Sequence, residues 1–146
     1  MELSPSIAVS SIKHGEVYYF SCQDLTTDEP HYFVCIHTKE NDFAIFTCCT
    51  TQKENLEKYL QRYKKDYSTV VYIEPNADNG LKKETYMNCN AYFRYSHKQL
   101  TDMFDNKKIK FKGKVTSVVL SQIHAGILAS DAIEEEIKDL LIDVEI

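Results

Sequence analysis

The stretch HYFVCIHTKENDFAIFTCCTTQ, His31–Gln52, holds two runs of strand-forming residues on either side of the polar sequence KEND. Aromatic and β-branched side chains dominate both runs, which predicts two strands, 31–37 and 43–49, joined by a turn. The second strand ends in FTCCTTQ, where two cysteines, two threonines and a glutamine follow one another. Nucleophilic and hydrogen-bonding side chains at a strand end make this exit the first candidate for a functional site.

Further strands are expected on both sides of this hairpin, at GEVYYFS (15–21), STVVYIEP (68–75), KETYMNCNAY (83–92) and KKIKFKGKV (107–115). The last of these alternates, so its lysines share one face: Lys108, Lys110, Lys112 and Lys114. Such a face fits either a ribbon that follows a phosphate backbone or a solvated edge strand protected by lysine, and we favour the edge strand.

Four segments show helical spacing: 52–65, 95–104, 115–128 and 130–142. In the first of them Leu56, Tyr59, Leu60 and Tyr63 form one apolar stripe, and Thr51 with Glu54 resembles a capping box. Ser96 and Ser130 are the expected N-caps of the second and fourth. About six short strands with several helices predict an α+β fold on a small, strongly curved antiparallel sheet.

The chain of 146 residues is expected to form a single domain, 1–146. It shows neither a secretory signal nor a long apolar run, so we expect a cytoplasmic protein without a membrane segment. The five scattered cysteines are expected to be reduced: Cys22, Cys35, Cys48, Cys49 and Cys89. The net charge of the chain is −5, and residues 131–146 alone contribute −6, so residues 1–130 have a net charge of +1. This nearly neutral body neither demands nor excludes a polyanionic ligand.

Three interpretations of the strand exit follow from its residue types: a cysteine nucleophile, a zinc site and a plain turn. A cysteine nucleophile needs a lowered pKa and a nearby base such as His31 or His37, but no cysteine here lies in a catalytic signature. A zinc site needs paired ligands at short spacing, which the histidines and cysteines do not offer. A plain turn whose threonines cap the following helix is the remaining structural explanation.

The order of motifs resembles the PemK/MazF family of plasmid-maintenance and growth-inhibitor toxins. GEVYYF stands for the family's opening strand, HYFVCI for its R-P-hydrophobic strand, CCTTQ for its strand ending in T-S, and GLKKETYMNCN for its strand ending in R-C-D. IHAGILASDAIEEEIKDLL supplies the closing helix. The helix between Gln52 and Lys65 and the lysine strand lie outside the family's minimal plan.

The resemblance implies a curved SH3-like barrel with peripheral and C-terminal helices, acting as a homodimer. It also implies a metal-independent endoribonuclease of a toxin–antitoxin system, or an RNA-binding relative, with single-stranded RNA and an antitoxin protein as partners and no cofactor. A non-catalytic protein-interaction module on the same barrel is the alternative function. The segment FTCCTTQ then directs its threonines toward a substrate groove.

The family positions transfer as follows. His31 stands where the family has the arginine of R-P, and Thr50 matches the strand-end threonine, so these two are the expected catalytic pair. In the R-C-D segment Asn88 and Asn90 replace the charged residues around Cys89. The expected substrate-binding residues are Thr51, Gln52, Lys82, Lys83, Asn88 and Asn90.

Cleavage of RNA without a metal requires a proton acceptor for the ribose 2′-OH, a proton donor for the leaving oxygen, and donors to the developing charge. An imidazole with an ordinary pKa near 6.5 suits either proton-transfer role, so His31 is expected to serve as acid or base. A threonine hydroxyl can donate to a phosphate oxygen. The two asparagines can position substrate but carry no positive charge and exchange no proton.

Overall fold

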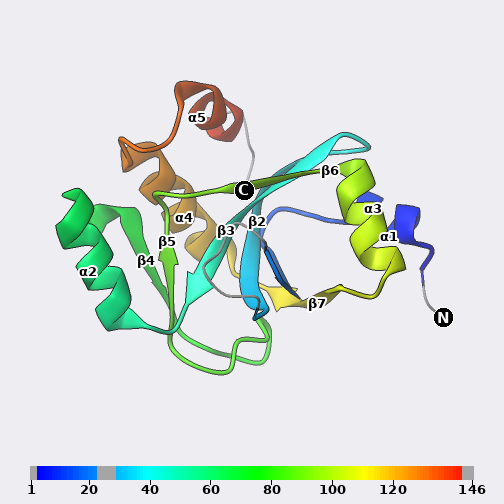
Figure 1. Ribbon diagram of the computed structural model, residues 1–146, viewed down its shortest axis with the longest axis horizontal. Helices are drawn as coiled ribbons and strands as arrows, with labels where there is room; N and C mark the ends of the chain where they lie inside the picture. Colours follow the sequence, from blue (N-terminus) through cyan, green and yellow to red (C-terminus); the bar gives the residue numbers. More distant parts are fainter. Residues whose placement is uncertain (1–2, 23–28, 143–146) are drawn as a thin grey trace.

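The computed structural model describes residues 3–22 and 29–142, and within these ranges the chain forms a seven-stranded sheet surrounded by helices (Figure 1). All strand pairs are antiparallel. The strands are β1 (Glu16–Phe20), β2 (His31–Lys39), β3 (Phe43–Thr50), β4 (Val70–Ile73), β5 (Thr85–Asn88), β6 (Phe93–Ser96) and β7 (Ile109–Lys114). The predicted α+β class with a curved antiparallel sheet is therefore confirmed.

The helices gather at the two ends of the long axis and over one face of the sheet (Figure 1). They are α1 (Pro5–Ser10), α2 (Lys53–Tyr63), the short 3-10 helix η1 (Tyr67–Thr69), α3 (His97–Asp105), α4 (Ser117–Ala129) and α5 (Glu135–Ile142). Ser96 is the N-cap of α3, as the sequence predicts, and the structure adds a complete capping box with Gln99. Among the described residues, no helix has the length and apolar character needed to cross a membrane.

Strand β3 is the centre of the sheet because it pairs along both of its edges. On one edge it pairs with β2. On the other edge its first residues pair with β6 and its last two, Cys49 and Thr50, pair with β5. The strand order is β4-β5-β3-β2-β1-β7, with β6 as the additional partner of β3.

The sheet is curved but not closed, since within the described ranges β4 and β7 end the strand order without pairing to each other. The turn between β4 and β5 bridges the gap instead: the Lys114 amide donates a 2.8 Å hydrogen bond to the Asp78 carbonyl. A Cβ atom at Gly80 would lie 2.2 Å from the Lys112 carbonyl oxygen. The turn and β7 therefore meet backbone to backbone, and the barrel expected from the resemblance is completed by a loop rather than by strand pairing.

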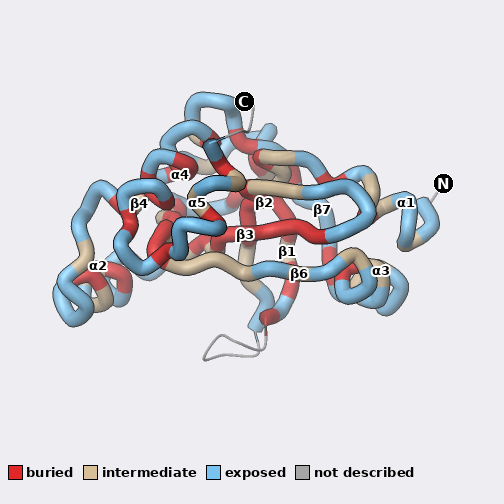
Figure 2. The backbone as a smooth tube through the Cα atoms, turned by 90° about the horizontal axis from the view of Figure 1, so that it is seen from above, coloured by how far each residue is buried: buried red, intermediate tan, exposed pale blue. Residues whose placement is uncertain are grey.

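Each face of the sheet carries its own core. On one face the side chains of Val17, Val34 and Ile45 pack with Ile123 and Ile127 of α4. On the other face a second cluster, rich in aromatic rings, includes Phe20, Phe33 and Phe46 together with Leu100 of α3. Figure 2 shows the buried run of β3 between exposed outer helices. Strand residues buried on both sides explain why the predicted strands lack clean alternation.

Several local predictions differ from the structure. Strand β6 and helix α1 were not expected. The N-cap of α2 is Gln52, which makes no side-chain cap hydrogen bond, so the capping box expected of Thr51 and Glu54 is wrong. Ser130 ends α4 rather than starting α5, which begins at Glu135. Tyr63, expected on the buried stripe of α2, is 52% exposed because the helix ends there.

Three histidines lie where α4 meets β2. The rings of His14 and His37 stack at 5.5 Å between centroids, and His14 Nε2 accepts a 3.1 Å hydrogen bond from the Thr38 amide. His124, buried on α4, contacts the Ile36 carbonyl through Nε2 at 3.0 Å. Burial lowers the pKa of all three imidazoles, and neighbouring histidines lower the pKa of His37 further. The folded protein therefore favours their neutral forms.

We expect the protein to lose stability as the pH falls from about 7 to about 5. Histidines in the unfolded chain take up protons near their ordinary pKa, whereas those in the fold do so only at lower pH. The unfolded state thus binds more protons in this window, and the free energy of unfolding decreases. Urea unfolding at several pH values measures it. His124→Gln, which retains an amide donor for the Ile36 carbonyl, should flatten the dependence, and a flat wild-type profile would contradict the expectation.

Candidate functional site

The exit of β3 opens into a pocket of about 790 Å³ between the start of α2 and the β4–β5 loop. Four of the residues predicted to bind substrate line it together: Thr51, Gln52, Lys82 and Lys83. We call it the exit pocket; its other lining residues are Lys53, Glu54, Asn55, Pro75 and Glu84. Three lysines against two glutamates leave a small positive charge around an open, polar cavity. Such a pocket suits an anionic group that remains partly solvated.

The first turn of α2 forms one wall of this pocket. Backbone amides in the first turn of a helix have no partner within the helix, and they attract anions together with the helix dipole. The N-cap Gln52 does not cap them with its side chain; its Oε1 accepts from Asn55 Nδ2 at 2.8 Å instead. The pocket therefore combines amide donors with lysine side chains.

The predicted catalytic pair lies at the same end of the sheet. The pairing between β2 and β3 extends to Phe33 and Cys48, and His31 and Thr50 each lie two residues beyond this pair. Since side chains alternate along a strand, both belong to the same face as Phe33 and Cys48. Thr50 Oγ1 accepts the Gln52 amide at 3.1 Å, which leaves its own hydrogen free to be donated. His31 is half-buried, and its Nδ1 is enclosed without a partner among the described residues.

Two tyrosines extend this face across the sheet, and sequence reasoning did not identify them. Thr50 is the direct partner of Tyr86 in β5, and Tyr86 is the direct partner of Tyr72 in β4. Thr50, Tyr86 and Tyr72 are thus aligned by strand pairing, and His31 lies on the same face of neighbouring β2; we call these four residues the cross-strand row. Tyr72 is 45% exposed, and the two rings lie 5.5 Å apart. The signal was present in the alternation of VVYI and TYMN, but only the register shows that both rings align with Thr50.

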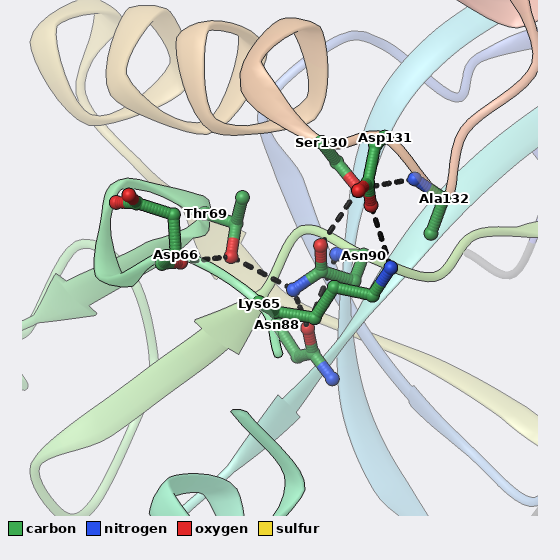
Figure 3. A network of polar contacts seen from close by, with 8 residues as sticks. All are labelled: Lys65, Asp66, Thr69, Asn88, Asn90, Ser130, Asp131 and Ala132. Atoms are coloured by element: carbon green, nitrogen blue, oxygen red, sulfur yellow. Dashed lines mark hydrogen bonds and ion pairs between the residues drawn. The ribbon is translucent and has the colours of Figure 1, made fainter. Parts of the chain in front are cut away.

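Asn88 and Asn90 lie at the opposite end of the β4–β5 hairpin from the exit pocket, in an internal polar network (Figure 3). Asn90 is 5% exposed; its Nδ2 donates to Thr69 Oγ1 at 2.8 Å and to Asn88 Oδ1 at 2.9 Å. Its Oδ1 accepts from the Ser130 hydroxyl at 2.7 Å. The structure therefore brings these two asparagines together with each other but not with the exit pocket, and substrate binding by them stays a prediction.

We expect Asn90→Ala to lower the free energy of unfolding by about 2 kcal/mol, because it leaves the buried Ser130 and Thr69 hydroxyls short of a partner. The network ties β5, η1 and α4 together, so the loss should appear in global unfolding by urea. Asn55→Ala, an exposed asparagine in α2, is the matched control and should change stability little. Equal stability of Asn90→Ala and wild type would contradict a structural role for Asn90.

The two cysteines at the strand exit, Cys48 and Cys49, and the cysteine that follows β5, Cys89, are not activated as nucleophiles. Burial raises the pKa of the Cys48 and Cys89 thiols to about 12 and raises that of Cys49 well above its ordinary value. Cys49 Sγ contacts Met87 Sδ at 3.0 Å in the core. Because the thiolate is the nucleophile, these three side chains are inert at neutral pH. This finding opposes the cysteine-dependent alternative.

The lysine strand β7 and the aromatic residues of β6 have structural positions. β7 is an edge strand whose lysines are exposed, as predicted, although Phe111 is exposed as well. Phe93 and Tyr95 pack against the aromatic core, and the Arg94 guanidinium lies 4.1 Å from the centroid of the Phe43 ring. Within the described residues, no group of three or more His, Cys, Asp or Glu side chains could hold a metal ion.

No protein-family model matches the chain, and no curated protein matches it. Among solved structures, the fold is similar to an endoribonuclease in complex with its cognate antitoxin from a mycobacterial species. The superposition has a TM-score of 0.52 and 13% sequence identity, and it covers 85% of this chain and 98% of that chain. The likeness thus spans nearly all of the other chain and concerns the fold.

Proposed function

We propose that this protein binds single-stranded RNA in the exit pocket and is a divergent relative of PemK/MazF-like toxins. The observation that carries the proposal is the convergence of Thr51, Gln52, Lys82 and Lys83, singled out from the sequence as substrate-binding, on one pocket. The fold's similarity to a toxin-type endoribonuclease supports the same direction. Phosphate groups fit the lysines and the free amides of the α2 first turn.

We further propose that the cross-strand row carries the chemistry of a metal-independent cleavage. His31 Nε2 accepts the proton of the ribose 2′-OH as that oxygen bonds to phosphorus and the bond from phosphorus to the 5′-oxygen breaks, and the protonated ring then donates this proton to the leaving 5′-oxygen; Nδ1 is enclosed and takes no part. The Thr50 hydroxyl donates to a phosphate oxygen, since it accepts the Gln52 amide and keeps its own hydrogen. We also propose, as the resemblance implies, that the protein forms a homodimer and binds an antitoxin protein.

The test is the salt dependence of RNA affinity. Removing two phosphate contacts with Lys82→Ala/Lys83→Ala should weaken binding and reduce the slope of log affinity against log salt by about 1.4, at 0.7 per phosphate on single strands. Lys108→Ala/Lys110→Ala removes the same charge from the β7 edge and should leave the slope unchanged. RNA binding that is lost equally in both variants would contradict the pocket. Wild type without RNA affinity would favour the non-catalytic protein-interaction module.

A further inference from the structure

A pair of tyrosines without a described function lies next to the exit pocket. Tyr72 and Tyr86 stand side by side on β4 and β5 and continue the row that begins with His31 and Thr50. The tyrosine rings are tilted by 53° and separated by 5.5 Å between centroids. The other residues of these strands that face the opposite side, such as Val71 and Met87, belong to the core. The two tyrosines therefore point away from that core on the surface that carries the proposed catalytic pair.

The row and the exit pocket are continuous. Glu84 lines the pocket and precedes the first residue of β5, and its carboxylate is near enough to the Tyr72 hydroxyl to influence the pKa of that hydroxyl. Partial desolvation, followed by the Glu84 carboxylate, raises the pKa of this hydroxyl. Tyr72 therefore lies next to Glu84 at the edge of the exit pocket, with its hydroxyl neutral. A polymer whose phosphates reach Lys82 and Lys83 would pass the tyrosine rings on its way to Thr50.

We propose that Tyr72 and Tyr86 form a stacking surface for RNA bases, which holds the strand beside Thr50 while its phosphates lie in the exit pocket. This inference rests on the proposed function. An unpartnered aromatic pair beside a cationic pocket is the combination that binds single strands: the lysines attract the backbone, and each ring takes the face of a base without regard to its identity. A partner of this kind needs both parts, and here they lie on adjoining surfaces.

The tyrosine pair beside the lysines favours a nucleic acid over a small anion as the ligand. A free phosphate would contact the lysines and amides of the pocket but would leave the tyrosine pair without a partner. Exposed apolar surface of this kind often marks an interaction site. A base adds the flat apolar partner that the rings lack. The lysines thus account for binding of the phosphate groups, and the tyrosines account for binding of the heterocyclic bases attached to the same chain.

The experiment measures the affinity of a short, mixed-sequence 2′-O-methyl RNA, which cannot be cleaved by its own 2′-oxygen, and of an abasic strand of the same length. Tyr72→Ala and Tyr86→Ala should each weaken RNA binding about tenfold and leave the abasic strand unaffected. Tyr72→Phe and Tyr86→Phe keep the ring and should retain RNA affinity. Tyr63→Ala is the matched control, because Tyr63 is 52% exposed and pairs with Tyr59 on α2, outside the row. Thermal unfolding confirms that each variant folds.

The outcomes separate this inference from the function on which it rests. Weaker binding in Tyr72→Ala or Tyr86→Ala, with the effect confined to RNA that carries bases, supports stacking. If Lys82→Ala/Lys83→Ala weakens binding but the tyrosine variants bind like wild type, stacking is wrong and the pocket stands. Equal affinity of wild type for the RNA and the abasic strand likewise overturns stacking alone. If wild type binds neither strand, RNA binding itself is wrong, and stacking falls with it.

Discussion

Replacing Gly113 with alanine is expected to lower the free energy of unfolding by about 2–3 kcal/mol, the cost of forcing extra volume into a packed site. A Cβ atom there would lie 2.3 Å from the Asp78 carbonyl oxygen and 2.6 Å from the Asn79 carbonyl carbon. Both are backbone atoms, so no side chain can rotate away to relieve the clash. The turn that bridges β4 and β7 must then shift as a whole.

Urea unfolding followed by circular dichroism measures the effect. Lys110→Ala, an exposed change on the same strand, should remain within about 0.5 kcal/mol of wild type. Gly80→Ala should be at least as harmful, because Gly80 also has a φ of +69°, a region that disfavours a side chain. If Gly113→Ala unfolds like Lys110→Ala, the close backbone contact between the turn and β7 is wrong.

His31→Ala is expected to reduce RNA cleavage by at least about 100-fold, the lower range for loss of a general acid or base. The assay is cleavage of a long, mixed-sequence RNA in EDTA. His97→Ala removes a histidine at the start of α3, at the other end of the molecule from α2 and the exit pocket (Figure 1), and should leave cleavage intact. Cleavage that survives in His31→Ala would point to a different site or to a contaminating nuclease.

Thr50 gives an independent check on the same row. Thr50→Val preserves the shape and removes the hydroxyl, so cleavage should fall, whereas Thr50→Ser keeps the hydroxyl and should retain most of it. Both variants should bind RNA with similar affinity, since the lysines and amides of the exit pocket remain. Equal cleavage by the valine and serine variants would exclude Thr50 from the chemistry.

Much of the fold was predictable because it depends on local patterns. The β2–β3 hairpin, helix α2 and the start of α3 follow from strand-forming residues around a polar turn, from apolar spacing and from Ser96 as an N-cap. β6 was missed because it has four half-buried or exposed residues without a clear period, and only its pairing with β3 makes it a strand. α1 was missed because it is only six residues long.

The candidate site was likewise predictable only in part. Thr51 and Gln52 follow the end of a strand, so their location at its exit was evident from the sequence. Their meeting with Lys82 and Lys83 depends on the β4–β5 hairpin, whose register no local pattern encodes. The resemblance to the toxin family suggested that Asn90 contacts substrate, whereas burial and three side-chain hydrogen bonds give it a structural position. The position of single residues along a strand could be predicted from the sequence, whereas their neighbours across strands could not.

The bridge from the β4–β5 turn to β7 also orders events during synthesis. Both strands of that hairpin leave the ribosome before Ile109, where β7 begins, so the hairpin can form while its anchor has not yet been made. Lys82 and Lys83 then belong to an unanchored loop until Lys114 reaches Asp78. A nascent chain stopped before β7 would carry every residue of the exit pocket without the support that fixes their geometry. Binding competence should therefore arise late, with the arrival of the last strand.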